Sequence, residues 1–157
     1  QVITEATELP IVLQGIKTEM VLWGLKGKIR SCDGIAQTAD DKGNCADCAC
    51  PSALPDRKAA SKAGTGCTPS LGLFFRVDVP SLVDLGLFRF YSGAWTFAKD
   101  LAPVEAAFNE FDGACKATIG KERVEFTASD GAEIKFTKPV LTLGEQLGAV
   151  TGNSEPF

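Results

Sequence analysis

The sequence predicts an α+β protein: a mostly antiparallel sheet with one or two helices and a cysteine-rich, zinc-knuckle-like insertion. Short apolar runs bounded by glycine and proline indicate strands, one stretch with helical apolar spacing indicates a helix, and five of the six cysteines fall in one loop-rich segment. With 157 residues, 45% hydrophobic and 23% charged, the composition is that of an ordinary folded protein. We therefore expect a single domain, residues 1–157, with its cysteine-rich insertion at about 31–70.

Residues 1–30 predict one or two strands. The apolar runs at 11–16 and 20–25 are partly β-branched, and glycines interrupt them. Basic residues then occupy alternate positions, so in an extended chain they share one face: Lys26, Lys28 and Arg30.

The insertion, residues 31–70, is rich in glycine and proline and has little apolar periodicity. Such a segment cannot bury a core of its own, so it needs a cross-link to hold it. Within it, Asp56 to Ala63 predicts a short helix that ends at Gly64.

The sheet resumes after the insertion. Residues 71–79 predict a buried strand that Pro80 ends, and residues 87–91 predict the next strand. Residues 92–93 mark the start of a helix whose apolar side chains recur at helical spacing. We expect Pro103 to end or restart that helix.

A β-hairpin is predicted towards the C-terminus. Residues 123–128 and 133–138 alternate apolar and polar side chains around the turn signal Ser129-Asp130-Gly131. Residues 139–143 are expected to add an edge strand. The apolar side chains of the hairpin are expected to share a buried face: Val124, Phe126, Ile134 and Phe136.

The chain contains no histidine. This excludes Ser-His-Asp and Cys-His nucleophile pairs, HExxH zinc sites and imidazole general bases. The net charge of −4 weighs against a general nucleic-acid coat, which needs a basic surface. No apolar run reaches the roughly 20 residues that cross a bilayer. We therefore predict no catalytic residues, no enzymatic activity and no membrane contact.

The cysteine spacing predicts a structural zinc site. A C-x2-C turn places two thiolates on one side of a loop, and cysteines from flanking segments complete a four-thiolate site. Zinc suits a segment without a core because the free energy of metal binding becomes free energy of folding. Closed all-cysteine coordination leaves no position for water, which counts against a metal-dependent hydrolase. Five candidates compete for four positions, with Cys48 or Cys50 as the surplus one: Cys32, Cys45, Cys48, Cys50 and Cys67.

Other interpretations of the cysteines stay open. Six cysteines suit three disulfides in a secreted protein, although Cys48 and Cys50 are too close to pair with each other. A four-thiolate iron–sulfur cluster is a second alternative, but the spacing matches no common ferredoxin pattern. Free buried thiols are a third, and clustering in a polar loop argues against them. Cys115 stands apart, and we interpret it as structural.

Basic residues flank the cysteines on both sides. If a metal draws these flanks together, they form a local phosphate-binding patch on an otherwise acidic protein. Ordinary solvated charge is the alternative interpretation. The candidate nucleic-acid contacts are Lys26, Lys28, Arg30, Arg57, Lys58 and Lys62.

Several stretches of the chain together resemble a known family. Over roughly residues 28–101 the sequence is similar to phage recombination directionality factors of the type that partners large serine integrases. Cys45 departs from the pattern of that family. The stretches that carry the resemblance are Arg30-Ser-Cys-Asp-Gly34, Cys48-Ala-Cys-Pro51, Arg57 to Ala63, Gly66-Cys-Thr-Pro69, Leu71 to Pro80, and Leu87-Phe-Arg-Phe-Tyr-Ser-Gly-Ala-Trp95.

The resemblance implies a non-enzymatic regulator in the cytoplasm of a bacterial host. It would bind a serine integrase, with an auxiliary contact to DNA, and turn integration into excision. Exposed aromatic residues such as Trp23, Phe88 or Tyr91 would supply the protein contact, with a place in the core as the alternative for each. Two other functions stay open: a single-stranded-DNA-binding or replication accessory protein whose aromatic residues stack on bases, and a secreted, disulfide-linked structural or assembly subunit.

Overall fold

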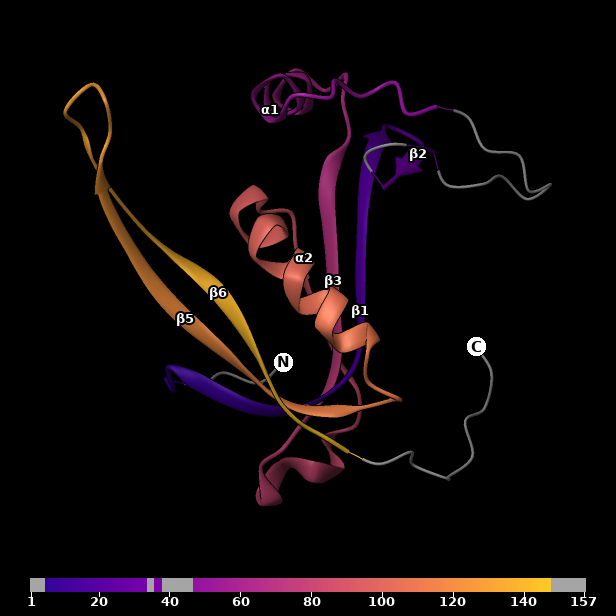
Figure 1. Cartoon of the computed structure of the whole chain (residues 1–157), viewed down its shortest axis with the longest axis vertical. Coiled ribbons are helices and arrows are strands. Elements are labelled where there is room, and N and C mark those ends of the chain that lie inside the picture. Colours follow the sequence, from indigo (N-terminus) through magenta and orange to yellow (C-terminus); the bar gives the residue numbers. More distant parts are fainter. Residues whose placement is uncertain (1–4, 34–35, 38–46, 148–157) are drawn as a thin grey trace. The chain divides into compact units, whose positions relative to one another are not determined.

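The computed structural model describes residues 5–33, 36–37 and 47–147 (Figure 1). A mostly antiparallel sheet and two α-helices make up the described part of the chain, which confirms the predicted fold class. The elements are β1 (Glu8–Gly24), β2 (Gly27–Cys32), α1 (Leu54–Lys62), β3 (Thr68–Val77), a short 3-10 helix η1 (Pro80–Leu85), β4 (Phe88–Ser92), α2 (Trp95–Asn109), β5 (Cys115–Thr127) and β6 (Glu133–Gln146).

The strands follow the order β4-β3-β1-β5-β6, and β2 pairs with β1 outside this path. β1 pairs antiparallel with β2, β1 with β5, and β5 with β6. None of the helices in the described ranges is long and apolar enough to cross a membrane.

The chain divides into two compact units. The hairpin unit consists of Gln1–Ile16, Leu73–Phe90 and Lys99–Phe157, and the cysteine unit consists of Lys17–Gly72 and Tyr91–Ala98. The expectation of a single domain stays a prediction. Each unit contains buried apolar side chains: Ile11, Leu13, Leu73, Phe75, Val77, Leu101, Cys115, Ala117 and Leu141 in the hairpin unit, and Val21, Cys32, Cys67, Leu71 and Phe97 in the cysteine unit.

The two N-terminal apolar runs form one long strand, β1, although glycines interrupt them. Gly15 does not break it: the strand pairs with β5 over residues 8–13 and with β2 over residues 20–24, and β3 is its neighbour in the sheet. The strand ends instead at Gly24. Gly27, with a φ of 124°, closes the turn into β2.

Both predicted helices are present, and one is longer than expected. α1 ends before Gly64, whose φ of 73° suits a glycine at a helix C-terminus. α2 continues through Pro103, so the expectation that this proline ends or restarts the helix is wrong. Proline removes one helical hydrogen bond. Burial of Leu101 in the adjacent turn offsets that loss.

The predicted β-hairpin is formed by β5 and β6, which run side by side in Figure 1. Gly131, with a φ of 84°, lies in its turn, and the Ala128 amide donates to the Ala132 carbonyl at 2.8 Å. The expected separate strand at 139–143 is the continuation of β6, in which Pro139 pairs with Lys121. Proline is tolerated there because β6 is the last strand in the described order of the sheet.

The apolar face of the hairpin is less buried than expected. Val124 and Phe136 are half-buried, but Phe126 is 50% exposed and Ile134 37% exposed. The reason is that, within the described residues, β1 pairs with β5 up to Gly120, so the turn end of the hairpin extends past the described part of that partner. The rings of Phe126 and Phe136 contact each other edge-to-face, with centroids 6.5 Å apart.

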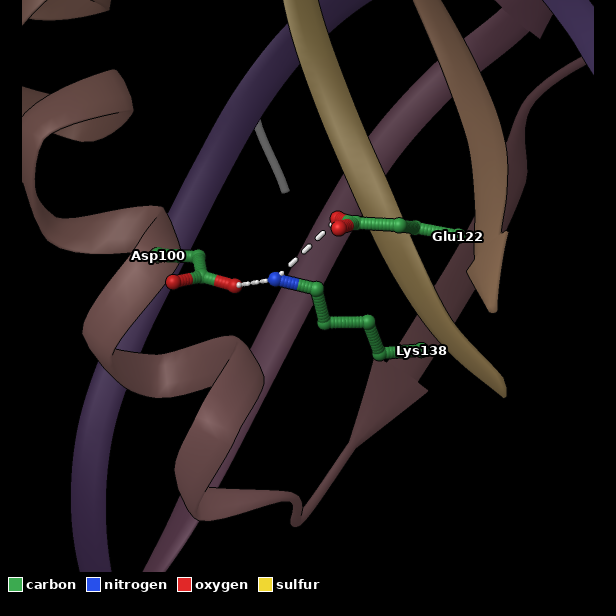
Figure 2. A network of polar contacts seen from close by, with 3 residues as sticks. All are labelled: Asp100, Glu122 and Lys138. Atoms are coloured by element: carbon green, nitrogen blue, oxygen red, sulfur yellow. Dashed lines mark hydrogen bonds and ion pairs between the residues drawn. The ribbon is translucent and has the colours of Figure 1, made fainter. Parts of the chain in front are cut away.

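An ion-pair network joins the hairpin to α2 within the hairpin unit (Figure 2). The Lys138 ammonium on β6 lies 2.7 Å from the Asp100 carboxylate on α2 and 3.2 Å from the Glu122 carboxylate on β5. Hydrogen bonds to Asp100 and then to Glu122 raise the pKa of Lys138 above its ordinary value of 10.5. The network therefore fixes one side of the hairpin against the helix.

Candidate metal centre

Two cysteines of the cysteine unit lie at the ends of strands. Cys32 is the last residue of β2 and is held in register by its pairing with Met20 of β1. Cys67 immediately precedes β3. Each is only 1% exposed. Backbone pairing therefore places two of the predicted ligands on ordered parts of the unit.

The other two described cysteines, Cys48 and Cys50, lie in the segment between β2 and α1. Isolated bridges join Cys32 to Gln37 and Ala36 to Asp47. On the far side, Nε of Arg57 in α1 donates to the Pro51 carbonyl at 2.6 Å. The segment that carries Cys48 and Cys50 is therefore tied to β2 at one end and to α1 at the other.

A close approach between α1 and the following turn brings Cys67 into place. The amides of Thr65 and Gly66 both donate to the Ala60 carbonyl at 3.0 Å. A Cβ at Gly66 would lie 2.8 Å from Cβ of Ala60 and 3.1 Å from its carbonyl carbon. Only glycine allows this approach without a shift of the backbone.

The sulfurs of Cys32, Cys48 and Cys50 all lie within 4.8 Å of one another. The Cys48 thiol donates to the sulfur of Cys32 at 3.1 Å. Backbone amides also point at sulfur: the Cys50 amide lies 3.4 Å from the sulfur of Cys48, and the Cys67 amide lies 3.5 Å from the sulfur of Cys50. Amide donors of this kind stabilise thiolates.

Hydrogen bonding and burial shift the pKa values of Cys50 and Cys67 in opposite directions. Burial opposes ionisation of Cys50, but hydrogen bonds from the amide and side chain of Cys67, from Cys48 and from Arg30 lower the pKa of Cys50 to about 7. Burial raises the pKa of Cys67 and outweighs the hydrogen bond from Arg30. Near neutral pH Cys50 is therefore partly ionised, and a metal ion can deprotonate the thiols that bind it.

The donor set fits a thiophilic metal ion. Zinc in structural sites takes four nitrogen or sulfur ligands at about 2.3 Å for sulfur. Three sulfurs within 4.8 Å of one another can hold a metal ion, and Cys67 contacts this group through Cys50 and Cys32. The guanidinium of Arg30 lies against the side chains of Cys50 and Cys67, so a cation borders this group of sulfurs.

The structure brings together four of the five predicted metal ligands, and the fifth, Cys45, lies outside the described residues. Which of the five bind a metal stays a prediction. Cys115 belongs to the hairpin unit, where it is fully buried in β5, and burial raises the pKa of its thiol.

The predicted nucleic-acid contacts lie in different surroundings, and their role stays a prediction. Lys26 is in the turn after β1, and Lys28 on β2 pairs with Glu19 at 3.7 Å. Lys58 and Lys62 are exposed on α1, which also carries Arg57. Arg30 instead points its guanidinium at the cysteine cluster.

Sequence reasoning missed two features of the cysteine unit. One is the contact between Arg30 and the cysteines, for which the only signal is its position two residues before Cys32. The other is a surface hollow of about 320 Å³ beside two exposed aromatic side chains. Trp23 is 62% exposed and Tyr91 is 61% exposed. The hollow is lined by Trp23, Thr68, Pro69, Ser70, Leu71, Tyr91, Ser92 and Gly93.

These features define a class: a mostly antiparallel α+β protein in which strand ends and a loop gather cysteines into a candidate metal centre. The sequence model of the Gp3-like family, described as recombination directionality factor-like, matches residues 1–144. The chain belongs to this family and is a recombination directionality factor-like phage protein. No solved structure matches it significantly.

Proposed function

We propose that this chain is a recombination directionality factor that binds a serine integrase and shifts it from integration towards excision. The observation that carries the proposal is its membership of the recombination directionality factor-like family over residues 1–144. A binding protein shifts an equilibrium by as much as its affinity differs between the two states. In this proposal the chain binds the excision-competent arrangement of integrase and DNA more tightly than the integrating one.

The chain acts in this proposal without chemistry of its own, in the cytoplasm of the bacterial host. It has no histidine to serve as a general base. The described cysteine cluster consists of donors that suit closed structural coordination. Strand exchange is then the work of the integrase, and the contribution of this chain is a binding surface.

Zinc is the metal that we propose for the cysteine cluster. All of the described donors are sulfur, which zinc accepts in structural sites. When bound, zinc would supply a cross-link between the end of β2, the loop that carries Cys48 and Cys50, and the turn before β3. That cross-link would stabilise a segment that buries few apolar side chains of its own.

The proposed integrase contact is the hollow beside Trp23 and Tyr91. Tryptophan and tyrosine are the residue types most often responsible for binding energy at protein interfaces. The lining of the hollow carries no charged residue. This favours a protein segment over single-stranded DNA, because phosphates would need basic partners there. An auxiliary DNA contact would use the exposed lysines of α1, Lys58 and Lys62.

The test uses the full-length chain and the integrase encoded by the same phage. We expect the wild-type chain to bind that integrase. It should stimulate recombination between the two DNA sites that integration produces, and inhibit recombination between the two DNA sites that integration consumes. Trp23→Ala and Tyr91→Ala should each weaken binding by about 30-fold, the effect of an interface hot spot. Leu54→Ala, at another exposed apolar residue of the same unit, is the matched control and should bind as the wild type does.

Two results would contradict the proposal. A chain that neither binds the integrase nor changes its direction would overturn the function. A chain that binds single-stranded oligonucleotides without integrase, with an affinity that falls steeply with salt, would support the replication-accessory alternative instead.

A further inference from the structure

Arg30 has an unusual position for a basic residue near a protein surface. One of its terminal nitrogens lies 3.8 Å from the sulfur of Cys50 and 3.4 Å from the Thr65 carbonyl oxygen. Its Nε is buried and has no hydrogen-bond partner among the described residues. The guanidinium is therefore directed into the cysteine cluster rather than towards solvent.

A metal centre built from these cysteines needs a compensating cation. Four thiolates around a divalent ion carry a net charge of −2, and three carry −1. An uncompensated charge in a partly buried site is costly. Cys32 and Cys67 are both buried, so water screens this charge poorly on their side. Among the described residues, Arg30 is a basic side chain that lies against the sulfurs of Cys50 and Cys67.

The shape of the side chain matters as well as its charge. Arginine presents several N–H donors in a rigid planar fork, whereas lysine carries a compact ammonium on a flexible stem. One terminal nitrogen of Arg30 reaches both the sulfur of Cys50, before α1, and the carbonyl of Thr65, after it, and the guanidinium also hydrogen-bonds the Cys67 side chain. It therefore joins the two segments that flank α1 at the cluster.

We propose that Arg30 is the positioning residue of the metal centre, where its guanidinium compensates the charge of the thiolate-bound ion and fixes Cys50 relative to the turn before Cys67. The inference rests on the metal site of the proposed function. It assigns Arg30 to metal binding and removes it from the set of predicted DNA contacts. Metal-ligand geometry commonly depends on such outer contacts, and their removal typically weakens metal affinity by about 10- to 100-fold.

The test is a metal titration of the full-length, reduced, metal-free chain with Co²⁺, followed by competition with Zn²⁺. Arg30→Gln should weaken Co²⁺ and Zn²⁺ binding by about 10- to 100-fold. Arg30→Lys keeps the charge without the fork, so its affinity should fall between those of wild type and Arg30→Gln. Lys62→Gln is the matched control, because it removes an exposed basic residue of the same unit and should bind as the wild type does.

A spectroscopic readout separates this role from a general loss of stability. Hydrogen bonding lowers the energy of sulfur lone pairs. The sulfur-to-cobalt charge-transfer band should therefore move to lower energy in Arg30→Gln and stay in place in Lys62→Gln. If Arg30→Gln fails to fold, Arg30→Lys provides the same comparison with the charge retained.

The outcomes are distinguishable. Equal affinity and an identical spectrum in wild type, Arg30→Gln and Arg30→Lys would overturn the role of Arg30 alone. A wild-type chain that binds neither Co²⁺ nor Zn²⁺ would overturn the metal site together with this inference. A wild-type chain that does not bind the integrase, in a series of variants that still shows the expected order of metal affinities, would overturn the proposed function and leave the role of Arg30 standing.

Discussion

The sulfur of Cys32, at the end of β2, lies 3.1 Å from the sulfur of Cys48, which follows it by 16 residues. One sulfur is carried by a paired strand and the other by a loop that bridges and hydrogen bonds tie back to that strand. The strand end and the loop therefore contribute sulfur ligands to the same candidate metal site.

Replacing a cysteine of the cluster should abolish tight metal binding. Cys32→Ser removes one of the three sulfurs that lie within 4.8 Å of one another. A metal ligand contributes more than an outer contact, so Zn²⁺ affinity should fall by at least about 100-fold. Competition between the protein and a chromophoric chelator measures this affinity. Cys115→Ser, which removes the buried thiol of the hairpin unit, should leave it unchanged.

Alkylation of the thiols tests the alternative interpretation, in which the same cysteines form disulfides. In the metal-free, unreduced protein, alkylation should reach the half-buried Cys48 and Cys50 in the folded state, and Cys32, Cys67 and Cys115 only after unfolding, because burial shields these three thiols. Cluster thiols that become reachable only after reduction would establish disulfides instead and support the secreted-subunit alternative.

Gly66 should be intolerant of a side chain. In Gly66→Ala the new Cβ would meet the backbone and Cβ of Ala60, so the turn that carries Cys67 must shift away from α1. We expect a loss of about 1–3 kcal/mol in the free energy of unfolding, as for other overpacked sites, together with weaker Zn²⁺ binding. Urea denaturation and the metal competition measure the two effects.

Gly120→Ala is the matched control for this substitution. A Cβ at Gly120 would lie 3.7 Å from the Glu8 side chain, which is an ordinary contact distance. If Gly66→Ala and Gly120→Ala were equally stable and bound zinc equally well, the close approach of the turn to α1 would not be what positions Cys67.

The Lys138 ion pairs should make stability depend on alkaline pH. The pKa of Lys138 is raised in the folded protein by Asp100 and then by Glu122, so the folded state holds this proton more tightly than the unfolded state does. The stabilisation is fully present below the ordinary lysine pKa of 10.5 and is lost as pH rises through the folded-state pKa. The difference in melting temperature between wild type and Lys138→Met should therefore stay constant up to about pH 10 and shrink as the pH rises above about 10.5.

Lys135→Met controls for the loss of a lysine from the same strand. Lys135 pairs with Glu133 at 3.0 Å, but its side chain is far more exposed than that of Lys138. We expect a small effect that varies little with pH, as for exposed pairs in general. Equal pH profiles for the two variants would argue against a specific role of the Asp100–Lys138 contact.

Pro103 should limit the stability of α2. Proline is about 3 kcal/mol less favourable than alanine inside a helix, while proline also restricts the unfolded chain and returns about 0.4–1 kcal/mol. Pro103→Ala should thus stabilise the protein by about 2 kcal/mol, as measured by urea denaturation. Pro139→Ala, in the last strand of the described sheet order, should change stability little. A destabilised Pro103→Ala would show that the helix requires the proline.

Local sequence signals were enough for most of the elements. Turn residues such as Gly64 and Gly131 adopt the positive φ values for which glycine is suited, so the end of α1 and the hairpin turn were predictable. The alternating pattern of the hairpin placed Val124, Phe126, Ile134 and Phe136 on one face, which agrees with their pairing opposite one another in β5 and β6. The same pattern could not tell how far β1 accompanies β5, so it overestimated the burial of Phe126 and Ile134.

Strand pairing and packing, rather than local sequence signals, decided that β1 and α2 are each continuous. Glycine in β1 and proline in α2 are unfavourable by intrinsic propensity, so the local pattern predicts an interruption at each. In the folded chain, strand pairing holds β1 together and burial of Leu101 supports α2. Intrinsic propensities of about 1 kcal/mol for glycine and 3 kcal/mol for proline are within the reach of such tertiary terms.

The sequence by itself determined the α+β class, the family, the absence of histidine chemistry and the cysteines as the candidate metal donors. Those properties depend on composition and on short-range spacing, which a single chain displays directly. Only the tertiary structure decided that Arg30 contacts the sulfur of Cys50 and that Trp23 and Tyr91 border one hollow. Residues 20 or more positions apart meet because strand register and loop closure bring them together, and neither is encoded in the local pattern.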